Sequence, residues 1–159
     1  FKKDIVPLKM ITVGANKEMI TTMGGLSIKP DISLDECTLE SKDLLILPGG
    51  TTWNEEIHQP ILKRIGQALK LGTIVAAICG APTVLLKAGV GKGMKITCHT
   101  SVLDQMKGDY CCTEGDVEID GNIITGKGAG LSLPFALSIA GEFVDSATMD
   151  KIKAGLQVV

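Results

Sequence analysis

Residues 73–82 read TIVAAICGAP, and this stretch decides the fold. The run that ends at Ile78 is almost wholly apolar, which is typical of a strand in a parallel sheet covered by helices on both faces. Cys79 follows directly, and then come the small residue Gly80 and Pro82, a residue tolerated in the first turn of a helix. A nucleophile between a buried strand and a helix, with small neighbours, is the pattern of a nucleophile elbow. We therefore predict that Cys79 is the reactive centre.

The chemistry of such an elbow favours a reactive thiol. Open α/β sheets bind ligands at the carboxyl ends of their parallel strands. A thiolate at the start of a helix also meets unpaired backbone N–H groups and the positive end of the helix dipole, which favour its ionised, nucleophilic form. The alternative is a small buried core cysteine at a strand end, and the glycine and proline that follow Cys79 make this the weaker interpretation.

Predicted strands and helices alternate on both sides of this stretch. Besides 73–78, strands are predicted at 9–13, 21–28, 43–47, 95–98, 117–119 and 122–125, and helices at 54–71, 80–89, 131–144 and 145–159. The helix at 131–144 is expected to be amphipathic, and Asp120-Gly121 is a hairpin signal between the last two strands. This alternation predicts a single α/β domain over residues 1–159, a flavodoxin-like three-layer sandwich with a mostly parallel sheet.

A pair of glycines is a second candidate feature. Gly49 and Gly50 follow the predicted strand at 43–47. Paired glycines after a buried strand can point backbone N–H groups into a cleft, where such groups stabilise an oxyanion. Pro-Gly-Gly is also an ordinary turn, and both interpretations stay open on the sequence alone.

The two histidines differ in context. His99 ends the predicted strand at 95–98, and if that strand lies beside the one before Cys79, the histidine lies close to the thiol. A satisfied surface histidine at a strand end is the alternative. His58 falls inside the predicted helix at 54–71, and we interpret it as a solvated helix residue.

Composition excludes several classes of function. A formal net charge of −2 and only 3% aromatic residues argue against a nucleic-acid-binding protein. No apolar run approaches the roughly 18 residues of a membrane span. Five cysteines without framework spacing argue against a disulfide-stapled secreted domain, so we expect a cytoplasmic protein. Cys111 and Cys112 are adjacent, and side chains of neighbouring strand residues point to opposite faces, so a shared metal ion is not expected.

The chain resembles the ThiJ/PfpI superfamily, which has the class I glutamine amidotransferase-like fold, and within it the Parkinson disease protein deglycase branch. The motifs that carry the resemblance are LLILPGG at 44–50, VAAICGAP at 75–82, KITCH at 95–99 and DGNIITGKGAG at 120–130. By this resemblance, Cys79 is the nucleophile, His99 is its nearby histidine, and Gly49, Gly50 and Gly80 line the oxyanion site.

The resemblance also implies an activity. We expect a cysteine-dependent, glyoxalase- or deglycase-like enzyme that acts on small reactive carbonyls as a homodimer, without a cofactor or metal. Two alternatives remain within the same superfamily: a non-enzymatic redox-sensing stress protein or chaperone with an oxidisable Cys79, and a cysteine peptidase.

The start of the chain departs from the family pattern. The family opens with a strand and a helix that carries a glutamate hydrogen-bonded to the cysteine. Glu18 is the only early glutamate and lies in a turn-like stretch, so we do not assign it this role. We expect a further segment of roughly 30–45 residues before Phe1, which carries the acid and a central strand next to the nucleophile strand. The competing expectation is that residues 9–13 take that central place.

Overall fold

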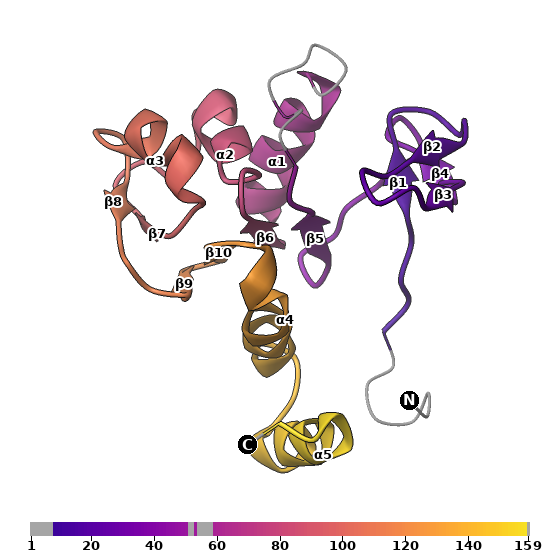
Figure 1. Cartoon of the computed structure of the whole chain (residues 1–159). Coiled ribbons are helices and arrows are strands. Elements are labelled where there is room, and N and C mark those ends of the chain that lie inside the picture. Colours follow the sequence, from indigo (N-terminus) through magenta and orange to yellow (C-terminus); the bar gives the residue numbers. More distant parts are fainter. Residues whose placement is uncertain (1–7, 51–52, 54–58, 159) are drawn as a thin grey trace.

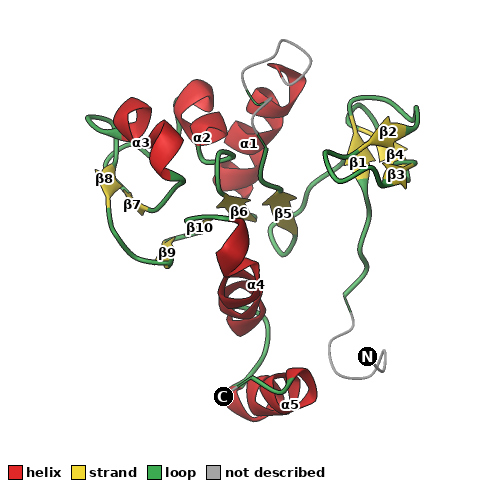
Figure 2. Ribbon diagram, viewed as in Figure 1, coloured by secondary structure: helices red, strands yellow, loops and turns green. Residues whose placement is uncertain are grey.

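A computed structural model describes residues 8–50, 53 and 59–158 (Figures 1 and 2). Helices and strands alternate along most of it. The elements are β1 Val13–Gly14, β2 Ile20–Thr21, β3 Ser27–Ile28, β4 Ile32–Ser33, β5 Leu44–Leu47, α1 Gln59–Leu71, β6 Ile74–Ile78, α2 Thr83–Ala88, β7 Lys95–Ile96, α3 Thr100–Met106, β8 Cys111–Cys112, β9 Val117–Asp120, β10 Ile123–Gly126, a short 3-10 helix Ala129–Leu131, α4 Ser132–Gly141 and α5 Ser146–Leu156.

The central sheet has four strands in the order β5-β6-β10-β9. β6 pairs in parallel with β5 on one side and with β10 on the other, and β9 runs antiparallel to β10. The predicted hairpin is therefore present, but Asp120 already pairs with Ile123, so the turn residues are Gly121 and Asn122 rather than Asp120 and Gly121. The α/β class and the mostly parallel central sheet are confirmed.

Helices cover both faces of this sheet, as Figure 1 shows: α1, α2 and α3 lie on one side and α4 on the other. Side chains of β6 alternate between two cores. Val75 and Ala77 belong to the larger core under α1 to α3, whereas Ala76 and Ile78 pack with residues of α4. Because both faces are covered, every position can be apolar, which explains the continuous hydrophobic run.

The N-terminal strands form separate small sheets. β1 pairs in parallel with β4, and β2 pairs with β3 as an antiparallel hairpin around Gly25. Figure 1 places this group beyond β5. The expectation that residues 9–13 take a central place is therefore wrong: the strand is Val13–Gly14 and lies outside the central sheet.

The expected place of a further strand also needs correction. No position beside the nucleophile strand is open, because β5 and β10 occupy both sides of β6. Within the described residues, the unpaired edge of the central sheet on the N-terminal side is that of β5.

Two other expectations differ from the structure. The strand expected at 95–98 is only Lys95–Ile96, and it pairs with β8 instead of joining the central sheet. The helix expected at 131–144 is α4, and it is not amphipathic, since apolar side chains surround it while only Phe135 and Ile139 are buried. The predicted start of the first long helix at Asn54 lies outside the described residues, as does His58.

Among the helices that the structure describes, none has the length and apolar character needed to cross a membrane.

Candidate active site

Cys79 stands at a sharp backbone elbow between β6 and α2. Its φ of 66° lies in the left-handed region, which only one other described non-glycine residue, Gln157, shares. Such a conformation costs an L-residue roughly 1–2 kcal/mol and persists only where the surroundings hold it. Here the Cys79 N–H donates to the Gly126 carbonyl at 2.8 Å, and the Cys79 carbonyl accepts from the His99 N–H at 2.9 Å. The elbow geometry predicted from the sequence is therefore present.

The turn Pro48–Gly50, called the glycine turn below, lies directly against this elbow. A methyl group on Gly49 would lie 3.0 Å from Cys79 Cβ and 3.7 Å from its Sγ. A methyl group on Gly80 would lie 2.5 Å from the Gly50 carbonyl oxygen, closer than any real side chain comes. Glycines at these positions therefore let two backbones meet beside the thiol, and the structure brings together the three glycines and Cys79.

His99 reaches the site by a route that differs from the expected one. Its strand β7 is not a neighbour of β6, so the two residues do not end adjacent strands of one sheet. They are joined instead by the backbone hydrogen bond between His99 N–H and the Cys79 carbonyl. The imidazole is exposed and caps α3, where Nδ1 accepts the Ser101 N–H at 3.2 Å and lies 2.8 Å from Ser101 Oγ. Because Nδ1 is an acceptor, the neutral ring carries its proton on Nε2.

The other cysteines have surroundings that suit inert thiols. Burial, and then the nearby charge of Cys112, raises the pKa of Cys98 to about 11. The pKa of Cys112 is also raised, mainly by burial. Cys37 is buried, and only Cys111 is exposed. Cys79 is half-buried at the elbow, so it combines access with a defined surrounding.

No acidic partner for Cys79 is present among the described residues. Glu18 is exposed, and its backbone N–H donates to Asn16 Oδ1 within its own turn. Within the same described parts of the chain, no group of three or more His, Cys, Asp and Glu residues could hold a metal ion. The described residues that meet at the elbow are the Cys79 thiol, the backbone of His99 and the backbone of the glycine turn.

Two residues beside the site carry no signal in the sequence. Trp53 Nε1–H donates to the Pro48 carbonyl at 3.1 Å, and Lys87 Nζ donates to the Trp53 carbonyl at 2.9 Å. No motif marks the contact between Lys87 and Trp53, because it joins residues 34 positions apart in the chain.

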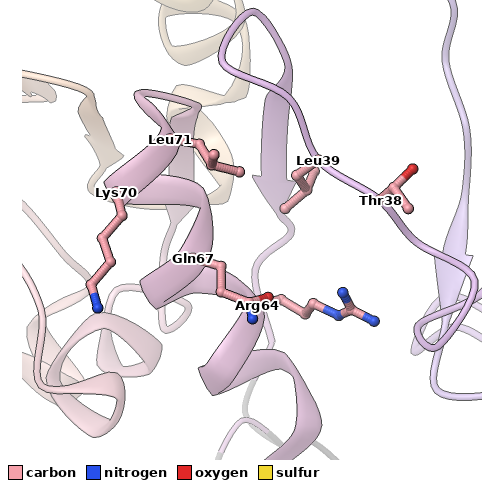
Figure 3. A pocket seen from close by; sticks show the side chains of 6 residues that line it. All are labelled: Thr38, Leu39, Arg64, Gln67, Lys70 and Leu71. Atoms are coloured by element: carbon pink, nitrogen blue, oxygen red, sulfur yellow. The ribbon is translucent and has the colours of Figure 1, made fainter.

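A hollow elsewhere on the surface is separate from this site. It lies between α1 and the segment before β5 and is lined by Thr38, Leu39, Arg64, Gln67, Lys70 and Leu71. Figure 3 shows Arg64 extended toward Thr38, while Lys70 points to the other side. Neither Cys79 nor His99 contributes to it, so it gives no support to the chemistry of the elbow.

Comparisons with known proteins show what this chain is similar to. A family model described as the DJ-1/PfpI family matches residues 6–142. The Bacillus subtilis protein named "uncharacterized protease YoaZ" is 54% identical over 147 residues, which cover 87% of this chain and 68% of the relative. The Caenorhabditis elegans "glutathione-independent glyoxalase DJR-1.2" is 33% identical over 134 residues, 83% of this chain and 72% of the relative.

A solved structure of a similar sequence has the same fold as this chain. The crystal structure of a ThiJ/PfpI family protein from Bacillus anthracis shares 59% sequence identity with this chain and superposes with a TM-score of 0.79. The match covers 90% of this chain and 69% of the other. These relatives are therefore longer than the chain of 159 residues.

Proposed function

The chain belongs to the DJ-1/PfpI family, and from this premise we propose that it is a cysteine-dependent enzyme acting on small reactive carbonyls, with the Cys79 thiolate as nucleophile. One observation carries the proposal. Cys79 is held in a left-handed conformation at the end of β6, beside a turn in which a Cβ atom on Gly49 would lie 3.0 Å from Cys79 Cβ and 3.7 Å from its Sγ. A structural cysteine needs no such strain, whereas strained backbone is concentrated at functional sites.

The reaction begins with addition. The sulfur lone pair of Cys79 forms an S–C bond to an aldehyde carbon, and the carbonyl π electrons move to the oxygen. The resulting oxyanion takes up a proton, which gives a hemithioacetal. With a dicarbonyl such as methylglyoxal, the carbon that bears the sulfur then loses its proton and the neighbouring carbonyl carbon gains one, while the hydroxyl proton moves to the neighbouring oxygen, which leaves a thioester of the hydroxy acid. Water then cleaves the thioester, which releases the hydroxy acid and restores the thiol. In sum, one dicarbonyl and one water give one hydroxy acid, with no external oxidant.

The roles of the other residues follow from their places. The backbone N–H groups of Gly49, Gly50 and Gly80 are assigned to the oxyanion, since Gly49 lies against the Cys79 side chain, and Gly80, which follows Cys79, packs against the Gly50 carbonyl. His99 is assigned to proton transfer for two reasons. Its backbone N–H donates a hydrogen bond to the Cys79 carbonyl, and, with Nδ1 as the acceptor, the neutral form of its ring carries its proton on Nε2. The name of the Caenorhabditis elegans relative, a glyoxalase, supports the choice of substrate class.

Formation of lactate from methylglyoxal tests the proposal. We expect Cys79→Ser to lower kcat/KM by at least roughly a hundredfold, because the hydroxyl is a far weaker nucleophile. Cys111→Ser is the matched control, since Cys111 is exposed and lies in β8 away from the elbow. Full turnover by Cys79→Ser would overturn the proposal.

Two other functions are outcomes of the same test. The name of the Bacillus subtilis relative supports peptide hydrolysis by the same thiol. Cleavage of casein that is lost in Cys79→Ser, without consumption of methylglyoxal, would favour a peptidase. Oxidation by peroxide confined to Cys79, without turnover of either substrate, would favour a redox sensor, because an accessible thiol is oxidised through sulfenic to sulfinic acid.

A further inference from the structure

The glycine turn is held from two sides by contacts outside the glycines themselves. Its first residue, Pro48, receives a hydrogen bond from the Trp53 indole at 3.1 Å. The Trp53 carbonyl in turn receives a hydrogen bond from Lys87 Nζ at 2.9 Å. Trp53 also packs against the larger core. Trp53 is thus hydrogen-bonded to the glycine turn, and Lys87 of α2 is hydrogen-bonded to Trp53.

Lys87 belongs to the helix that follows the nucleophile. α2 spans Thr83–Ala88, and Thr83 Oγ1 donates to the Gly80 carbonyl at 2.7 Å, so α2 is bonded directly to the elbow. Lys87 lies in the last turn of α2, and its Nζ donates to the Trp53 carbonyl, so the same helix also contacts Trp53. One short helix therefore holds the elbow at its start and the loop through its last turn.

The distances leave little room for movement of the turn. A Cβ atom on Gly49 would lie 3.0 Å from Cys79 Cβ, and one on Gly80 would lie 2.5 Å from the Gly50 carbonyl oxygen, so the glycine turn and the elbow are closely packed. An oxyanion accepts hydrogen bonds only from donors placed about 2.7–3.1 Å from the position where it forms. A displacement of about 1 Å at such a site can cost roughly a hundredfold in rate.

We propose that Trp53 and Lys87 are positioning residues that hold the glycine turn in place for the oxyanion formed when Cys79 adds to a carbonyl. This inference rests on the proposed function. Neither residue needs to touch the substrate. Their effect is transmitted through the Pro48 and Trp53 carbonyls to the Gly49 and Gly50 N–H groups.

The chain contains a single tryptophan, so its fluorescence reports on this contact directly. Lys87→Met keeps the length of the side chain and removes the donor, and Lys87→Arg restores a donor. Lys92→Met is the matched control, because Lys92 forms an exposed ion pair with Asp109 beyond the end of α2. Each variant is compared by tryptophan emission and acrylamide quenching, by kcat and KM for methylglyoxal, and by the rate at which iodoacetamide alkylates Cys79.

We expect Lys87→Met to shift the emission to longer wavelength, to increase quenching and to lower kcat by roughly tenfold or more with little change in KM. Alkylation of Cys79 should keep its rate, because displacement of iodide forms no oxyanion. Lys87→Arg should restore emission and kcat, and Lys92→Met should change neither.

The possible failures are distinguishable. Normal emission in Lys87→Met, or a shifted emission with unchanged kcat, would overturn the positioning role while leaving the proposed function intact. A wild-type chain that turns over no carbonyl would overturn the proposed function and this catalytic role with it. A shifted emission in Lys87→Met would then show only that the lysine orders the loop. An equal fall of kcat in Lys87→Arg would assign the effect to general disruption and would also overturn the proposal.

Discussion

The five cysteines occupy five different environments, and their reactivity follows from those environments. Cys98 and Cys112 have raised pKa values, so their thiolates are scarce at neutral pH. Cys37 is buried, and Cys111 is exposed but lies in a short strand without a surrounding site. Since the thiolate is the nucleophile, access alone does not decide reactivity.

We expect iodoacetamide at neutral pH to alkylate Cys79 at least several times faster than Cys111, and both before Cys98. The reason is that Cys79 combines access with the strained elbow between β6 and α2, and strained backbone is concentrated at functional sites. Peptide mapping by mass spectrometry over a time course measures the five rates in the folded protein. Equal rates in folded protein, or Cys111 as the fastest site, would contradict the assignment of Cys79 as nucleophile.

Gly80 gives a second prediction at the level of one residue. Its missing side chain would lie 2.5 Å from the Gly50 carbonyl oxygen, which is backbone and cannot turn away. We expect Gly80→Ala to lower the free energy of unfolding by roughly 1–3 kcal/mol, as overpacking does. Urea denaturation measures this change. Gly130→Ala is the control, because nothing lies within 4 Å of the added methyl group. Equal stability of both variants would contradict the close packing of the two turns.

At the scale of elements, the sequence predicts what is local and misses what depends on distant partners. The β6–elbow–α2 unit is contiguous in sequence, and its apolar run, glycine and proline determine it. The expected place of β7 is beside the nucleophile strand, but its partner β8 lies about 15 residues later, and no local pattern marks that pairing. The His99 backbone N–H still donates a hydrogen bond to the Cys79 carbonyl, because the chain after β7 turns back toward the elbow.

The N-terminal strands illustrate the same limit. The sequence predicts a strand at 21–28, whereas the structure has two short strands, β2 and β3, paired as a hairpin across the turn that contains Gly24 and Gly25. β1 instead pairs with β4, nearly twenty residues away, and a pattern of single apolar residues cannot specify such a partner. The contact between Trp53 and Lys87 escapes prediction for the same physical reason.

The segment after β7 yields a prediction about pH. Burial raises the pKa of Cys98 from 9.0 to about 11. Below pH 9 the thiol is neutral in folded and unfolded chains alike, so its contribution to stability is fully present there. Between pH 9 and 11 the unfolded chain releases its proton first, so the free energy of unfolding falls as pH rises, by roughly 3 kcal/mol at most.

Urea denaturation at pH 8.5 and pH 10.5, values on the two sides of the unfolded-state pKa of about 9, measures this loss. Cys98→Ala should lose less stability over this interval than the wild type. Cys111→Ala should behave as the wild type does. Tyr110, whose pKa burial raises to about 12, is present in all three chains and cancels in the comparison. An identical loss in Cys98→Ala would show that another group causes the alkaline destabilisation.

At the scale of the whole molecule, the apolar surface is unevenly distributed. Of the thirteen large apolar side chains that are exposed among the described residues, eight lie between Leu8 and Leu26. Ile46 of β5, at the open edge of the central sheet, is 50% exposed. An edge strand with unpaired backbone groups and apolar side chains is a template for pairing with another chain. The homodimer expected from the family resemblance stays a prediction. We expect copies of the 159-residue chain to associate through the open edge of β5.

We therefore expect the chain to self-associate with increasing concentration, and Ile46→Lys to weaken that association by roughly tenfold or more, because an unpaired charge costs several kcal/mol when buried. Ile119→Lys is the matched control: Ile119 is 44% exposed and lies in β9, the other edge strand, which β7 approaches. Sedimentation velocity over a wide concentration range measures both variants, with thermal melting to verify that each is folded. A chain that stays monomeric throughout would contradict association at β5. An equal effect of Ile119→Lys would also contradict it, because the loss would then follow from added charge rather than from the open edge.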